Sequence, residues 1–139
     1  MANMMPSTLT SLDTRRARRM LASNAAFSGA CALPMILASS DIAQALLGND
    51  DWSAIVTFVG VALLGYVAVL LFARSQPTAK MRRWLLGFSA ADALWVVGTV
   101  VVLVMLPAAF TPAGLVTAAL IAVIVGWFGM NQLRLGLAR

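Results

Sequence analysis

Apolar residues along this chain gather into four blocks of nearly uninterrupted hydrophobic sequence. The blocks run from about residue 20 to 47, 52 to 73, 84 to 106 and 112 to 133. About 20 helical residues, rising 1.5 Å each, cross a hydrocarbon core roughly 30 Å thick, so each block has membrane-spanning length. The pattern predicts an all-α integral membrane protein, a bundle of four transmembrane helices joined by short loops.

Residues at the ends of these blocks agree with helix boundaries. Asp50 and Asp51 stand where an N-cap is needed before the second block. Thr111 followed by Pro112 is typical of a cap and first helical position before the fourth block. Pro107 closes the third block.

The first block is irregular, because Pro34 interrupts it and a short polar run follows. We therefore expect a span over residues 20–38 and then a short interfacial helix over 41–47. Ser40 would cap that interfacial helix and Gly48 would end it. The alternative is one long, tilted helix kinked at the proline.

Basic residues all fall on one side of the predicted membrane. They precede the first span, fill the second connection and follow the fourth span: Arg15, Arg16, Arg18, Arg19, Arg74, Lys80, Arg82, Arg83, Arg134 and Arg139. The two opposite connections contain no Lys or Arg. The positive-inside rule therefore places both chain ends in the cytoplasm. Residues 1–19 are expected to form a flexible basic cytoplasmic tail, and residues 20–139 a single transmembrane domain.

The net charge of +5 arises from these juxtamembrane residues. Membrane lipids are therefore the expected partners, with anionic headgroups near the arginine clusters, and nucleic acid is not. Other membrane proteins, or a second copy of this chain in an oligomer, are further candidate partners. Richness in Ala, Val, Gly and Arg favours a bacterial chain in the cell inner (cytoplasmic) membrane over a mitochondrial one.

Missing residue types exclude several kinds of chemistry. The chain has no histidine, and all five of its acidic residues are aspartates. Histidine-ligated haem, the usual zinc sites and glutamate-based di-metal bundles are therefore excluded. Cys31 is the only cysteine, so no intrachain disulfide forms. With no phosphate-binding loop and no nucleophile–base pair, we expect no metal, no cofactor and no enzymatic activity.

One carboxylate falls inside a predicted span. Asp92 lies roughly 12 Å from the cytoplasmic end of the third block, and an intramembrane carboxylate is costly enough to mark a candidate site. Polar and aromatic residues at similar depth complete a candidate polar cluster: Asp92, Asn24, Ser28, Tyr66, Ser89, Trp95 and Asn131. The simpler interpretation of this cluster is that its hydrogen bonds hold the helices together. The alternative is that Asp92 is an ionisable site for a ligand.

Small residues favour close helix packing. Ala118, Ala122 and Gly126 recur every fourth position in the fourth span and predict a helix-packing face. A weak repeat also relates residues 18–26 to 82–91, because in each an arginine pair precedes an Ala-rich stretch. A true repeat would produce two helical hairpins of the same orientation.

No motif in the chain identifies a function. The length and four-span layout resemble those of the small multidrug-resistance transporters, whose mark is a membrane-embedded glutamate in the first helix. This chain lacks that residue, and Asp41 is its nearest acid there. The favoured interpretation is an accessory, assembly or structural component of a membrane complex. The alternative is a small transporter, or a binder of a lipophilic or cationic small molecule, that uses Asp92.

The charge pattern makes a testable prediction about topology. Reporter fusions or cysteine labelling in cells should place residues 74–83 and the C-terminus in the cytoplasm. Asn49 and Ala108 should be reached only from outside, because their connections carry no basic residue. A C-terminus found outside would remove the four-span arrangement.

Overall fold

The computed structural model describes residues 11–138, which are helical almost throughout. The elements in chain order are α1 (Ser11–Leu37), α2 (Ser39–Leu47), the 3-10 turn η1 (Asp50–Trp52), α3 (Ser53–Ser75), α4 (Thr78–Met105), the 3-10 turn η2 (Pro107–Ala109) and α5 (Pro112–Leu137). Four of these helices, α1, α3, α4 and α5, are long and apolar enough to cross a membrane. No strand occurs between residues 11 and 138. The predicted all-α class and the four long helices are confirmed.

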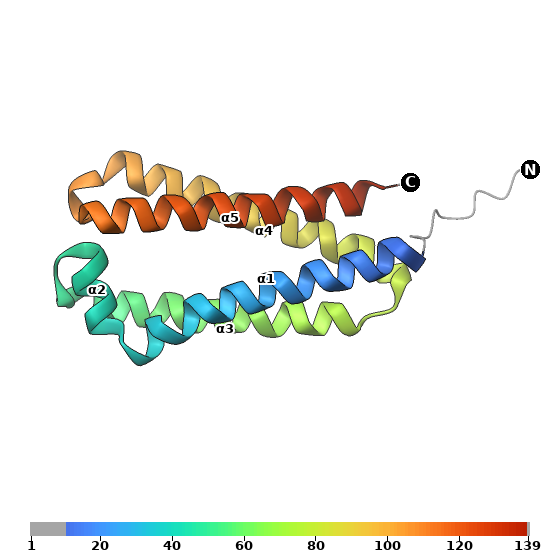
Figure 1. Cartoon of the computed structure of the whole chain (residues 1–139), viewed down its shortest axis with the longest axis horizontal. Coiled ribbons are helices and arrows are strands. Elements are labelled where there is room, and N and C mark those ends of the chain that lie inside the picture. The colour runs from blue at the N-terminus through green and yellow to red at the C-terminus, as the bar shows by residue number, and fades with distance from the viewer. Residues whose placement is uncertain (1–10, 139) are drawn as a thin grey trace, which may run out of the picture.

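The four long helices pair as two hairpins. α1 packs along α3 and α4 packs along α5, whereas the contacts between the hairpins are fewer (Figure 1). α1 and α4 run in one direction, and α3 and α5 run in the other. The two hairpins therefore have the same orientation, as a true repeat of residues 18–26 in residues 82–91 would require. That the two hairpins are related in sequence stays a prediction.

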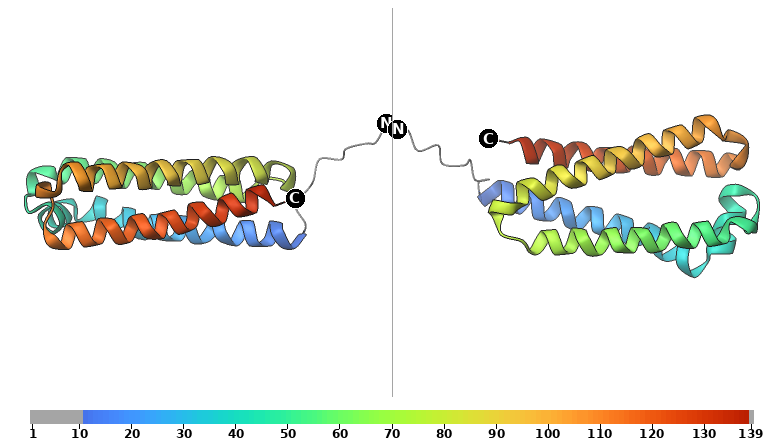
Figure 2. Two further views of the ribbon diagram at one scale, coloured as in Figure 1. Left: turned by 90° about the horizontal axis from the view of Figure 1, so that it is seen from above. Right: turned by 180° about the vertical axis from the view of Figure 1, so that it is seen from behind.

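The two ends of the bundle differ in what they carry. The start of α1, the end of α5 and the α3–α4 connection lie at one end, here named the terminal end. The helix α2 and the α4–α5 connection lie at the other, the α2 end (Figure 2). All the described basic residues lie in the segments at the terminal end, which agrees with the one-sided charge pattern.

Two helices begin earlier than the hydropathy predicts. α1 starts at Ser11, so residues 11–19 are helical and not part of a flexible tail; residues 1–10 lie outside the described part. Alanine and arginine favour helix, and Asp13 in the first turn complements the helix dipole. α4 likewise starts at Thr78, directly after Pro77, because helix formation does not require apolar residues.

The irregular first block forms two helices. The chain breaks at Ala38, whose backbone adopts φ −136° and ψ 42°, and α2 then follows. The single kinked helix is therefore wrong. Ala38 occupies the N-cap position without a side-chain hydrogen bond, so the expected Ser40 cap is also wrong. Gly48 ends α2 as predicted, with a φ of 70° that favours glycine.

Of the other predicted caps, one is confirmed and one is replaced. The Thr111 side chain accepts a hydrogen bond from the Gly114 N–H at 2.9 Å, which caps α5 as predicted. Before α3, however, the capping residue is Asn49 and not either aspartate. Its side chain accepts from the Asp51 N–H at 2.8 Å and caps η1.

A backbone junction joins the hairpins at the α2 end. The Thr111 N–H donates to the Leu46 carbonyl at 2.9 Å, and the Thr111 hydroxyl donates to the Ala45 carbonyl at 2.7 Å. A Cβ atom at Gly114 would overlap the Leu46 carbonyl oxygen. The first turn of α5 therefore reaches the end of α2 only because Gly114 has no side chain.

An apolar core and one polar contact hold the terminal end. Buried side chains of α1, α3 and α4 form a continuous cluster: Ala17, Leu21, Ala25, Leu70, Ala73, Met81, Leu85 and Phe88. The Arg82 Nε donates to the Gly136 carbonyl at 2.8 Å and ties α4 to α5. The core joins the two hairpins at this end, because it contains residues of α1 and α3 from one hairpin and of α4 from the other. The hairpins are thus joined at both ends of the bundle.

The predicted packing face on α5 is only part of the helix contact. Ala122 is buried, whereas Gly126 is partly exposed, as is Ala118. A Cβ atom at Gly126 would meet Val96 at an ordinary 3.7 Å. The tightest approaches along α5 lie instead at Gly114, Gly129 and Gly136.

The Gly114 contact predicts a stability difference. Gly114→Ala should lower the free energy of unfolding by about 1–3 kcal/mol, because the added methyl group overpacks against α2 backbone. Gly65→Ala is the matched control, since nothing lies within 4 Å of a Cβ atom there. Thermal melts in detergent, followed by circular dichroism, measure both. Equal melting temperatures would show that α5 does not approach α2 this closely.

Candidate functional site

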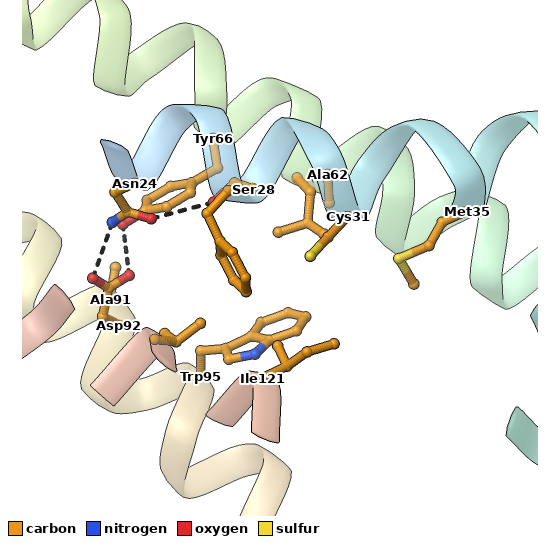
Figure 3. A pocket seen from close by; sticks show the side chains of 13 residues that line it. Asn24, Ser28, Cys31, Met35, Ala62, Tyr66, Ala91, Asp92, Trp95 and Ile121 are labelled. Carbon is orange, nitrogen blue, oxygen red and sulfur yellow. Dashed lines mark hydrogen bonds between the residues drawn. The ribbon is translucent and has the colours of Figure 1, made fainter. Parts of the chain in front are cut away.

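A buried carboxylate at the middle of α4 joins three helices. Asp92 has 3% of its surface exposed. The Tyr66 hydroxyl on α3 donates to Oδ1 of Asp92 at 2.7 Å, and Nδ2 of Asn24 on α1 donates to Oδ2 at 3.2 Å. The Ser28 hydroxyl donates to Oδ1 of Asn24 at 3.3 Å, which fixes the orientation of that amide (Figure 3). The network therefore links the two hairpins at mid-height.

The Asp92 carboxylate keeps unused acceptor capacity. Each of its oxygens accepts one hydrogen bond from the protein, although each can accept two. Within residues 11–138, no arginine or lysine forms an ion pair with it. A cationic or hydrogen-bond-donating group could therefore bind Asp92 without displacing Tyr66 or Asn24.

The helix α5 lies directly against this carboxylate. A Cβ atom at Gly129 would lie 3.0 Å from the Cβ of Asp92 and 3.6 Å from the Ser89 carbonyl oxygen. Any side chain at position 129 would push α4 and α5 apart at the level of Asp92. Gly129 therefore sets the position of the carboxylate relative to α5.

A cavity of about 290 Å³ extends from the network toward the α2 end. All four long helices line it, through Asn24, Phe27, Ser28, Cys31, Met35, Ala62, Leu63, Tyr66, Ala91, Asp92, Trp95, Ile121 and Val125. The polar groups gather at one end, around Asp92, while Met35 lies far from them (Figure 3). The cavity thus has a polar end and a long apolar part.

The cavity opens to one side of the bundle. Its exposed lining residues are Ala62 on α3 and Ala91 and Trp95 on α4. These two helices touch each other little, and the Trp95 side chain is 41% exposed. We infer that the opening lies between α3 and α4.

The remaining residues of the predicted polar cluster have different surroundings. Trp95 lines the cavity, and Ser89 is buried one turn before Asp92 on α4. Asn131 does not join the network, because its Nδ2 donates to the Trp127 carbonyl at 2.7 Å in a different part of the bundle. Asn131 was included in the predicted cluster because its depth in the membrane is similar to that of Asp92. Its side chain, however, lies on a side of α5 that does not line the cavity.

Sequence reasoning missed a second buried amide. Gln132 has 0% of its surface exposed, and within the described part of the chain neither Nε2 nor Oε1 has a hydrogen-bond partner. It lies one turn beyond Gly129, on the same side of α5. Buried polar atoms without partners are rare and mark places where a water molecule or ligand group can bind.

The chemistry available at the cavity is narrow. Residues 11–138 contain no group of acidic, cysteine or histidine side chains that could hold a metal ion. Asp92 is the only carboxylate in the cavity lining. No protein-family model, no curated protein and no solved structure matches this chain.

The two buried amides predict opposite responses to an apolar substitution. Gln132→Met should leave the free energy of unfolding unchanged or raise it by about 1–2 kcal/mol, because it removes two unpartnered polar atoms. Asn24→Leu should lower it by about 1–3 kcal/mol, because Asp92 and Ser28 lose their partner. Melting temperatures in detergent compare them. A similar loss for both would mean that Gln132 has a stabilising partner.

Proposed function

We propose that the four long helices span a bilayer, with the terminal end in the cytoplasm and the α2 end outside. Their length and hydropathy support this. So does the outward exposure of large apolar side chains on α3 and α4, such as Phe58 at 72%, Leu94 at 72% and Val104 at 70%. Only lipid or another apolar surface would cover them favourably. The inner membrane of a bacterium is the location that the composition favours.

Within that membrane, we propose that the chain binds a small lipophilic molecule that carries one cationic or hydrogen-bond-donating group. The observation that carries this proposal is the buried Asp92 carboxylate, which lies at the polar end of a largely apolar cavity and has no basic partner among residues 11–138. A carboxylate in such surroundings is costly to keep. A ligand with an amine would offset that cost and bury its apolar body in the cavity.

The size and the opening of the cavity restrict the ligand further. A volume of about 290 Å³ lies at the lower limit for small-molecule sites. An opening between α3 and α4 at mid-height would face the hydrocarbon core. A ligand that first dissolves in the bilayer would therefore reach the site sideways, without crossing the polar surface.

The accessory role predicted from the sequence is the second candidate. Three exposed glycines, Gly65 on α3 and Gly87 and Gly98 on α4, would have nothing within 4 Å of an added Cβ atom. They make no tight contact inside the bundle. Small residues on an outward face permit a helix of another protein to approach closely. Such a partner would pack on α3 and α4.

Binding of a simple amine tests the first candidate. Purified protein in detergent should bind phenylbutylamine more tightly than its uncharged analogue phenylbutanol. Asp92→Asn keeps the size of the side chain but removes its charge. It should weaken amine binding about tenfold or more, since a hydrogen bond to a charged group contributes roughly 1.5–3 kcal/mol. Equilibrium dialysis measures both affinities.

Asp41→Asn is the matched control, because it removes an exposed acid on α2 outside the cavity. It should leave amine binding unchanged. A melting curve shows whether Asp92→Asn remains folded. Equal amine affinities for the original chain and both variants would contradict the proposed site and leave the accessory role as the better explanation.

A further inference from the structure

A second, basic groove lies at the terminal end between α1 and α5. Its volume is about 500 Å³, and it shares no lining residue with the Asp92 cavity. Arg16 and Arg19 line it from α1, and Arg134 lines it from α5. The groove therefore lies between the two hairpins, where direct helix contacts are few.

The three guanidinium groups are available to a ligand. Within residues 11–138, none of them has a hydrogen bond or an ion pair, whereas Arg82 nearby is engaged with the Gly136 carbonyl. Asp13 also lines the groove, so its net charge is two positive charges. Guanidinium groups bind phosphate oxygens in a forked, charge-assisted geometry. The groove is suited to a phosphate group.

The groove also has an apolar part of its lining, beside the polar Ser23 and Asn131. Trp127, Met20 and Leu135 contribute its apolar surface. Farther along the same side of α5, Val123 is 69% exposed and Leu120 is 58% exposed. Along this side of α5, from the terminal end toward mid-height, the side chains are thus first basic (Arg134), then polar (Asn131), then aromatic (Trp127) and finally aliphatic. A phospholipid presents phosphate, glycerol esters and acyl chains in that same order.

We propose that this groove binds one anionic phospholipid, with its phosphate between Arg19 and Arg134 and an acyl chain along α5. The apolar surface that continues from the groove favours a lipid over a free phosphate compound. The bound lipid would bridge the two hairpins at the terminal end, as Thr111 bridges them at the α2 end. This proposal rests on the proposed membrane insertion, but it does not depend on a ligand at Asp92.

Native mass spectrometry of the full chain, purified in mild detergent, tests the proposal. Phosphatidylglycerol should remain bound in preference to phosphatidylcholine. The double variant Arg19→Gln/Arg134→Gln should bind phosphatidylglycerol about fivefold more weakly for each arginine removed. The double variant Arg74→Gln/Arg83→Gln removes the same charge from the same end but outside the groove, and it should retain the lipid as the original chain does.

An equal loss of lipid in both double variants would overturn the proposal, since general surface charge would then explain binding. Glycerol phosphate that displaces the lipid at equal concentration would also overturn it. If the groove variant does not fold, the melting temperature of the original chain tests the proposal instead. Phosphatidylglycerol should raise this melting temperature, and an equal rise with phosphatidylcholine would contradict a specific site. The topology measurement reports membrane insertion separately, so loss of selectivity in inserted protein counts against the groove alone.

Discussion

The buried Asp92 carboxylate is the constraint on which the arrangement of the four long helices depends. A carboxylate surrounded by apolar side chains must find donors, and the bundle supplies Tyr66 from α3 and Asn24 from α1. Interhelical hydrogen bonds of this kind contribute only about 1 kcal/mol each, so their main effect is to fix position. Gly129 completes the arrangement by letting α5 lie against the Asp92 side chain. The same contacts that satisfy Asp92 therefore form the polar end of the cavity.

The cavity exists because the hairpins are joined at their ends and at Asp92 but not between. At the α2 end, Thr111 and Gly114 bring α5 onto the end of α2. At the terminal end, the apolar core ties the hairpins together. Between the α2 junction and Asp92, the helices carry small or flexible side chains, such as Ala62, Cys31 and Met35, that do not fill the space. A lipophilic ligand would provide the missing contacts there.

The hydropathy of the sequence and the depth of each residue along its helix predicted much of this structure. What they did not predict is which side of its helix each residue occupies in the bundle. Span lengths were predictable because they follow from apolar runs, but the true start of α1 was not, since Arg-rich and Ala-rich turns continue a helix beyond its apolar part. Depth correctly brought Asn24, Ser28 and Tyr66 to the level of Asp92. Depth alone wrongly included Asn131 in the cluster and did not indicate that Gln132 is buried. The rotation of α5 about its axis decides both, and close contacts at Gly129 and Gly136 set that rotation. Apolar lining residues of the cavity have the same hydropathy as lipid-facing ones, so no sequence pattern separates them.

The central claim is that the space beside Asp92 is a binding site, and methyl NMR of methionine-labelled protein in nanodiscs tests it most directly. Met35 lines the cavity, whereas Met130 on α5 is 51% exposed and faces away from it. Phenylbutylamine should shift the Met35 methyl signal in a saturable way and give contacts between its phenyl ring and that methyl group, while the Met130 signal stays in place. Shifts that grow equally and without saturation at both methyl groups would show that the amine only dissolves in the surrounding lipid, and would contradict the site.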